Sequence, residues 1–205
     1  MATIHILTEQ VINQIAAGEV VERPASIVKE LLENSIDAGA TEISIYLRNG
    51  GKSLIEIIDN GSGIAPDEIK KAFLRHATSK INELSDLDQL LSLGFRGEAL
   101  ASIASVSMVT IETSTQVLAP QGKTMILNHG DIVEEGTISR QQGTTIRVEH
   151  LFAKVPARRK FLKSDRQELS AITRLVQEIA LTFPQIHFAL FHENKELLNT
   201  PPETA

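Results

Sequence analysis

The chain lacks cysteine altogether, and it also lacks long apolar runs and a surplus of positive charge. Without cysteine it has no disulfide bonds and no thiolate metal sites, which fits a reducing compartment. No apolar run approaches the ~18 residues of a membrane span, and the N-terminus has no basic segment followed by an apolar stretch, as a secretory signal would. The net charge is −6. Because nucleic-acid-binding domains are usually basic, we expect any such role to be local or to reside elsewhere.

The 205 residues are enough for one sizeable core, and 42% hydrophobic with 22% charged residues is ordinary for a globular protein. Helical patterns lie mainly in the first half and strand patterns mainly in the second. We therefore expect one layered α/β domain over residues 1–200, not alternating βαβ units, and the start of a linker at 201–205. The expected strands are 4–7, 41–47, 54–58, 106–113, 123–127, 131–135, 144–150 and 186–192, and the expected helices are 8–17, 24–37, 85–94, 97–105, one opening at 66–68 and one from 164 to 183.

Local signals define several ends of these elements. Pro24 suits the first turn of a helix. Asn49-Gly50 between two alternating segments predicts a hairpin. The acids of Pro66-Asp67-Glu68 suit the first turn of another helix, where they complement the helix dipole. Ser164 with Gln167 matches a capping box.

The helix over 24–37 carries a narrow polar stripe of Glu30, Asn34 and Asp37, opposite a broad apolar side. Asparagine is a mediocre helix former, so an asparagine in the middle of this helix suggests a function other than helix formation. If the stripe faces a nucleotide, Asn34 offers a neutral oxygen to Mg²⁺, and Glu30 can take a proton from a water that attacks the γ-phosphate. The alternative is a solvated helix face with incidental charges.

Asp59 follows the apolar pair Ile57-Ile58 at the tip of a predicted strand. A carboxylate there can accept a hydrogen bond from an exocyclic amine such as that of adenine. Gly61 and Gly63 let the backbone approach a flat base where a side chain would block it. The alternative is an ordinary Asp-Asn-Gly turn.

The segment Gly94-Phe95-Arg96-Gly97 leads into a helix that begins near Glu98. Free amides at a helix start, with glycines that permit close contact, form a phosphate cradle. The polar segment Arg75 to Lys80 could fold over the phosphates, with Thr78 and Ser79 donating hydrogen bonds and Lys80 supplying charge. The alternative is an exposed loop, and no Gly-x-x-x-x-Gly-Lys-Ser/Thr motif occurs in the chain.

Two further features of the sequence each allow two interpretations. Thr144, after Gly143, is either a plain strand residue or a hydroxyl that supports Asp59 through a water. The basic cluster Arg158-Arg159-Lys160, with Lys163, contacts the phosphates of DNA or a partner, or it is only a solvated surface.

In combination these segments resemble the GHKL ATPases, which include type II topoisomerase ATPase domains, sensor histidine kinases and a heat-shock chaperone family. Within that superfamily the chain is most similar to the MutL family of DNA mismatch-repair ATPases. The similarity covers nearly the whole chain, is most specific from 13 to 105 and is looser from 114 to 142. The segments that carry it are 13–24, 30–40, 75–80, 94–100 and 156–161.

The resemblance implies a GHKL α/β (α+β) two-layer sandwich, with a mixed, mostly antiparallel sheet and helices on one face. It implies ATP and Mg²⁺ as ligands, Glu30 as the general base, Asn34 as the metal ligand and Asp59 as the adenine contact. The other nucleotide contacts that it implies are Ala38, Gly63, Thr78, Ser79, Lys80, Gly94, Phe95, Arg96, Gly97, Glu98, Ala99, Leu100 and Thr144.

The same resemblance implies partners: a second copy of the chain on ATP binding, other mismatch-repair proteins, and DNA mainly through regions that this chain lacks, with no membrane. It implies the bacterial cytosol, with nucleoid association during repair. A second domain of the family supplies a lysine to the γ-phosphate, so we expect slow hydrolysis here. The alternative is a nucleotide-sensing interaction module with negligible turnover. Ala153-Lys154 departs from the family, which usually has an aromatic residue and asparagine there.

Overall fold

The computed structural model describes residues 20–74 and 98–202. The strand expected at 4–7 and the helices expected at 8–17 and 85–94 lie outside these ranges. The elements are α2 (Pro24–Asp37), β1 (Glu42–Arg48), η1 (Asn49–Gly51), β2 (Leu54–Asp59), α3 (Ile69–Ala72), α4 (Ala99–Ser105), β3 (Met108–Ser114), β4 (Gln121–Asn128), β5 (Asp131–Ser139), β6 (Gly143–Glu149), α5 (Pro156–Phe161), α6 (Asp165–Thr182), β7 (His187–His192) and β8 (Lys195–Thr200).

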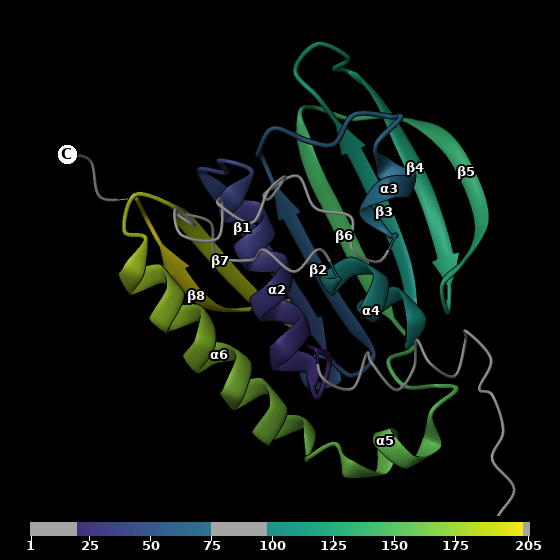
Figure 1. Ribbon diagram of the computed structural model, residues 1–205. Coiled ribbons are helices and arrows are strands. Elements are labelled where there is room, and N and C mark those ends of the chain that lie inside the picture. Colours follow the sequence, from purple (N-terminus) through teal and green to yellow (C-terminus); the bar gives the residue numbers. More distant parts are fainter. Residues whose placement is uncertain (1–19, 75–97, 203–205) are drawn as a thin grey trace, which may run out of the picture.

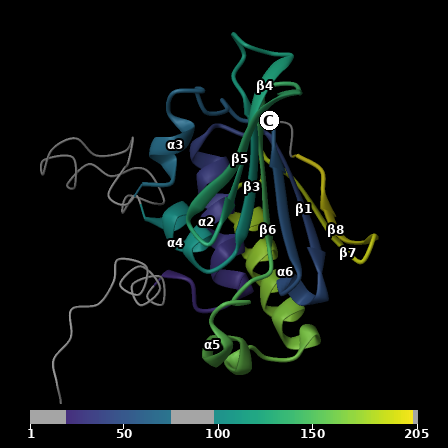
Figure 2. The ribbon, with the colours of Figure 1, turned by 90° about the vertical axis from the view of Figure 1, so that its right-hand side faces the viewer.

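The eight strands form one mixed sheet in the order β5-β4-β3-β6-β2-β1-β7-β8. Among the described strands, only β1 and β7 pair in parallel, and all other neighbours pair antiparallel. Figure 2 shows α2, α3, α4 and α6 on one side of the sheet, whereas the described residues place no helix on the other. The predicted two-layer α/β sandwich is therefore confirmed.

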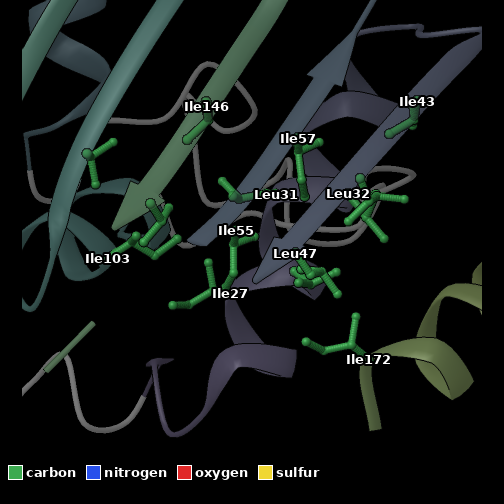
Figure 3. Close-up of a cluster of buried hydrophobic side chains, with 14 of the residues drawn as sticks. Ile27, Leu31, Leu32, Ile43, Leu47, Ile55, Ile57, Ile103, Ile146 and Ile172 are labelled. Carbon is green, nitrogen blue, oxygen red and sulfur yellow. The ribbon is translucent and has the colours of Figure 1, made fainter. Parts of the chain in front are cut away.

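The core lies between this helical layer and the sheet. In β1 the residues that point toward the helices are buried and those between them are exposed or half-buried, as expected for a strand with one wet face. Figure 3 shows Ile27 and Leu31 of α2 facing Ile55 and Ile57 of β2. Each of these four side chains is at most 2% exposed. Truncating one of them to alanine typically costs about 2–5 kcal/mol.

The packing fixes the direction of α2 across the sheet. At its start, the Pro24 side chain lies beside η1, where a Cβ on Gly51 would come within 3.0 Å of it. At its end, the carbonyl of Ala38 accepts the Ser62 amide at 2.9 Å, just beyond β2. The helix therefore runs alongside β2 and delivers its last turn to the end of that strand.

The structure differs from the sequence expectations in three elements. The expected terminal linker is preceded by an eighth strand, β8, which returns antiparallel to β7 through Glu193 and Asn194, both with positive φ. The helix expected to open at 66–68 comprises only Ile69–Ala72, so its acids precede it instead of filling its first turn. The segment 156–161 forms the short helix α5, which the periodicity did not indicate.

Candidate nucleotide site

Asp59 ends β2, and its carboxylate is almost completely buried, with 8% of the residue exposed. Oδ1 accepts the amides of Gly61 at 2.9 Å and Thr144 at 3.1 Å. Oδ2 accepts the hydroxyl of Ser35 at 3.0 Å. A carboxylate oxygen accepts about two hydrogen bonds, so Oδ1 is fully used and Oδ2 retains capacity for one more donor. The site thus presents a fixed acceptor in a dry environment.

Burial raises the pKa of the Asp59 carboxyl above its ordinary value. The hydrogen bonds from the Gly61 amide, the Ser35 hydroxyl and the Thr144 amide favour the charged form and oppose this shift, as does the charge of Arg140. Desolvation is the largest of these effects, because a charge in a low-dielectric site loses its hydration. A further donor on Oδ2 would favour the charged carboxylate, so the site is electrostatically suited to bind one.

Three glycines lie around Asp59 at positions where a side chain would collide with neighbouring atoms. A Cβ on Gly61 would lie 2.9 Å from the Cβ of Ala38. Gly63 has φ +72, and a Cβ there would lie 2.1 Å from the carbonyl oxygen of Ser114. Gly143 has φ +122, and a Cβ there would lie 2.1 Å from the carbonyl oxygen of Asp59. All three positions need glycine for the close approach of neighbouring chain segments, and Gly63 and Gly143 need it also for their backbone conformation.

Thr144 is a strand residue, which is the first of the two interpretations that the sequence left open. It belongs to β6, where it pairs with Asp59 in register. Its amide reaches Asp59 directly, whereas its hydroxyl lies 3.1 Å from the hydroxyl of Thr113. Thr113 Oγ1 also accepts the amide of Ile64 at 2.9 Å, which ties the glycine turn to β3. The two threonines therefore brace the turn beyond Asp59.

On α2, Glu30 and Asn34 are half-buried, and Asp37 is exposed at the end of the helix. Ser35, the neighbour of Asn34, reaches Asp59, so the last turns of α2 lie next to the acceptor. The last turn of α2, with Asn34, and its C-cap Ala38 therefore lie at the same end of β2 as Asp59, and Glu30 lies one helical turn before Asn34. Glu33, which the sequence pattern did not single out, is buried and pairs with Lys29 at 3.0 Å.

The remaining predicted contacts divide between two groups. Glu98 precedes α4 as its N-cap, and Ala99 and Leu100 form its first turn, which agrees with the expected helix start. Outside the described residues lie Thr78, Ser79, Lys80, Gly94, Phe95, Arg96 and Gly97. Within residues 20–74 and 98–202, no three His, Cys, Asp or Glu side chains gather into a metal cluster.

Sequence reasoning missed Ser35 and Thr113. Both are polar residues at positions where the pattern calls for an apolar one. Ser35 lies four residues after Leu31, on the buried side of α2. Thr113 continues the inward series Val109 and Ile111 in β3, and it is 1% exposed. A polar side chain in a core-facing register needs a hydrogen-bond partner, and that signal points to this site.

Comparison with known proteins agrees with this geometry. Residues 22–155 match the family model described as histidine kinase-, DNA gyrase B-, and HSP90-like ATPase. The chain belongs to this ATPase family. Its fold also superposes on the ATPase domain of Aquifex aeolicus MutL complexed with ADP, at a TM-score of 0.73 and 32% identity, over 90% of this chain and 66% of that one.

Within the family, the particular similarity is to the ATPase domain of MutL DNA mismatch-repair proteins, as the sequence segments predicted. The chain is 55% identical to MutL of Histophilus somni over 94% of its length, and 50% identical to MutL of Clostridium perfringens over 98%. It spans 31% and 30% of these two relatives, so it corresponds to about a third of their length. No helix in the described part of the chain is long and apolar enough to cross a membrane.

Proposed function

We propose that this chain binds ATP with Mg²⁺ and hydrolyses it slowly, as the ATPase module of a mismatch-repair protein. The observation that carries the proposal is the Asp59 acceptor. Its carboxylate is buried, held by the Ser35 hydroxyl and two backbone amides, and keeps one lone-pair direction on Oδ2 for a donor. The exocyclic amine of adenine provides such a donor, and guanine carries a carbonyl oxygen at that position.

Glu30 and Asn34 lie one helical turn apart on α2, and we assign them different roles. Asn34 would hold Mg²⁺, which offsets the charge of the phosphates. Glu30 takes the proton of the attacking water as general base. The phosphate contacts expected from Thr78 to Lys80 and from Gly94 to Gly97 complete the proposal.

The test is thermal unfolding with MgATP and, in parallel, with MgGTP. Ligand at about 100 times its Kd adds about 2.7 kcal/mol, which raises Tm by about 5–10 °C for a chain of this size. We expect this shift with ATP and a much smaller one with GTP. No shift at millimolar MgATP would overturn the proposal, and equal shifts with both nucleotides would overturn the role of Asp59.

The alternative is a nucleotide-sensing module with negligible turnover. Steady-state hydrolysis by the wild type and by Glu30→Ala separates the two functions. A rate that disappears in Glu30→Ala identifies a hydrolase. Equal residual rates would mean that Glu30 is not the general base or, where both rates are negligible, that the chain only senses nucleotide.

We further propose that ATP binding drives association with a second copy of the chain and signals to other repair proteins in the cytosol. The support is the similarity to MutL proteins, whose full chains are about three times as long. Light scattering with a non-hydrolysable ATP analogue tests the association, and a monomer at every nucleotide concentration would contradict it.

A further inference from the structure

The turn between β5 and β6, residues 140–142, packs against the end of β2 that carries Asp59. In the sheet β6 lies between β2 and β3, and its first residues pair with the last residues of β2 (Figure 1). Gln142 Nε2 donates to the carbonyl oxygen of Gly61 at 3.0 Å, and the amide of Gly61 in turn donates to Asp59 Oδ1. The turn is therefore joined directly to the chain segment that holds the proposed base acceptor.

Arg140, the first residue of this turn, lies on the face of the sheet where the described residues place no helix. Neighbouring residues of a strand point to opposite faces. In β6, Ile146 belongs to the core under the helices, so Thr145 points to the other face. Arg140 Nη1 donates to the hydroxyl of Thr145 at 3.1 Å and also to the carbonyl oxygen of Glu112. The guanidinium is thus fixed on the helix-free face.

Asp59 points the opposite way, toward the helices. It continues the buried series Ile55 and Ile57 of β2, and its partner Ser35 belongs to α2. Arg140 and Asp59 therefore lie on opposite faces of the sheet. Among the described residues, the Arg140 guanidinium forms no ion pair with a carboxylate, so it leaves Asp59 Oδ2 unoccupied.

A glycine of β4 makes room for the arginine side chain. A Cβ on Gly122 would lie 2.8 Å from Arg140 Cγ and 3.3 Å from its Cδ, so the aliphatic part of Arg140 covers this glycine. The main-chain amide of Arg140 donates to the carbonyl of Pro120 at 2.9 Å. Arg140 is half-buried as a result. Charged side chains seldom lie in such places without a compensating interaction, and that suggests a partner across the sheet.

Electrostatics couple Arg140 to Asp59. Burial raises the pKa of the Asp59 carboxyl, and the positive charge of Arg140 opposes this rise, because an opposite charge favours the ionised form. Burial likewise lowers the pKa of Arg140, and the charges of Asp59 and Glu112 oppose that change. Arginine keeps its charge in proteins, so the positive charge on the helix-free face is permanent.

No other charged residue of the described chain acts on the pKa of Asp59 in this way. The groups that contact its carboxylate, which are two amides and a hydroxyl, are all neutral. The other charged residues on the surrounding elements are Glu42 of β1, Glu112 of β3, Arg147 of β6 and Glu30, Glu33 and Asp37 of α2.

A proton on Asp59 would occupy the position that the ligand needs. Oδ1 accepts two amides, whereas Oδ2 accepts only the Ser35 hydroxyl. Protonation would therefore place the hydrogen on Oδ2 and turn the free acceptor into a donor. A cation in contact with Oδ2 would prevent protonation but would also block the site. A cation on the opposite face of the sheet keeps Oδ2 both ionised and open.

We propose that Arg140 is a positioning residue, which keeps Asp59 in its charged, accepting form from the face of the sheet opposite to the base. Arg140 thereby determines how strongly the site prefers a nucleobase with an exocyclic amine. The inference rests on the proposed ATP site and adds to it a residue that touches no ligand.

The experiment compares two magnesium nucleotides, ATP and purine riboside triphosphate, which lacks the exocyclic amine. Isothermal titration calorimetry with the whole chain gives both dissociation constants. A hydrogen bond to a charged acceptor contributes about tenfold or more in affinity, so the wild type should prefer ATP by at least that factor. Arg140→Gln keeps an amide donor but loses the charge. Its preference should fall to about threefold or less, with the affinity for purine riboside triphosphate unchanged within about twofold.

Three further variants control for packing. Arg140→Met covers Gly122 with an apolar side chain and should give the same result as Arg140→Gln. Arg140→Lys restores a positive charge and should keep most of the preference for ATP. The matched control is Arg147→Gln, which removes another arginine of β6, paired with Glu56 at 2.6 Å, and should bind both nucleotides like the wild type. The Tm of each variant without nucleotide reports its folding.

Three results would overturn the proposal. One is an equal weakening of both nucleotides in Arg140→Gln and Arg140→Met, which would assign Arg140 to packing alone. Another is a wild-type preference for ATP in both variants. The third is a loss of preference in Arg140→Lys as large as that in Arg140→Gln. Failure of the wild type to bind MgATP would instead overturn the proposed function, so the two failures are distinguishable.

Discussion

Ser35 donates its hydroxyl hydrogen to Asp59 Oδ2 at 3.0 Å, and both residues are buried. This bond joins the last turns of α2 to the end of β2. Because Asn34 precedes Ser35 directly, any displacement of the bond moves the proposed metal ligand and the proposed base contact together. The two halves of the proposed nucleotide site are thus fixed to one another before a ligand arrives, which is the condition for tight binding at low entropic cost.

Asp59→Asn should separate folding from nucleotide binding. The asparagine carbonyl can accept both amides that Oδ1 accepts, and the Ser35 hydroxyl can turn to accept from the new amide nitrogen. The buried charge disappears, so we expect a Tm equal to or above that of the wild type. The acceptor for the adenine amine becomes a donor, so the Tm shift with MgATP should vanish. A retained shift would show that Asp59 does not contact the base.

Ser35→Ala should destabilise the protein by about 1–2 kcal/mol at neutral pH, because a buried carboxylate loses a donor. The effect should depend on pH. The folded-state pKa of Asp59 is raised above 3.8, so its neutral form is favoured by folding, and that stability is present below 3.8 and lost as pH rises through the folded-state pKa. Losing the Ser35 donor raises this pKa further. The urea midpoint of Ser35→Ala should therefore lie further below that of the wild type at pH 8 than near pH 4. A constant difference between the two midpoints across this range would contradict the argument.

Periodicity and turn residues in the sequence were sufficient to predict the helix and strands that form the candidate site. They predicted α2, the β1–β2 hairpin and the position of Asp59, because one-sided burial imposes clear alternation there. They failed for β8, an edge strand in which neither face is fully buried and Leu197 and Leu198 are adjacent instead of alternating. An edge strand of this kind leaves almost no periodic signal in its sequence.

Contacts between residues far apart in the chain could not be predicted from the sequence either. That Thr144 donates its amide to Asp59 follows from the register of β2 against β6, between residues 85 positions apart. Neither strand contains information about that register by itself. The sequence could therefore nominate Asp59 and Thr144 as candidates, but it could not show that a backbone amide joins them.

Gly63→Ala should be far more costly than Gly39→Ala, although both glycines have φ near +70. A Cβ at position 39 has no atom within 4 Å, so only the left-handed backbone conformation opposes it, at about 1–2 kcal/mol. A Cβ at position 63 overlaps the carbonyl of Ser114 and forces a backbone shift, for a total of about 2–5 kcal/mol. Thermal unfolding of the pair checks this, and equal Tm values for the two variants would contradict it.

Glu168→Gln should show how much the Arg23–Glu168 ion pair holds α6 to the start of α2. Glu168 is almost completely buried and also accepts the Lys163 amide at 2.9 Å. Removing its charge leaves the Arg23 guanidinium without its anion in a partly buried place, at about 2–3 kcal/mol. The control is Glu178→Gln in the same helix, whose pair with Arg174 is exposed and should contribute less than about 1 kcal/mol. Chemical denaturation measures the free energy of unfolding of both variants. Similar decreases in the two would mean that the buried ion pair stabilises the protein no more than the exposed one.

His129 should make stability fall as the solution becomes acidic. Burial lowers the pKa of His129 below 6.5, and the charges of Lys154 and His150 act in the same direction, whereas Asp131 opposes them. In the described part of the chain its Nε2 is buried without a hydrogen-bond partner. The unfolded chain takes up a proton near pH 6.5 that the folded chain resists. Stability is therefore present above that pH and is lost as pH falls below it, by at most about 1.4 kcal/mol per pH unit.

Asparagine at position 129 tests this directly, because it tolerates the positive φ of 55 that His129 adopts. His129→Asn should flatten the dependence of the urea midpoint on pH between 7.5 and 5.5, where the histidine term acts. Lys154→Gln, which removes one of the charges that oppose protonation, should flatten it partly. Wild-type pH dependence in His129→Asn would place the acid sensitivity in other groups. An intermediate response in Lys154→Gln, with the full response in His129→Asn, would locate it in the turn between β4 and β5.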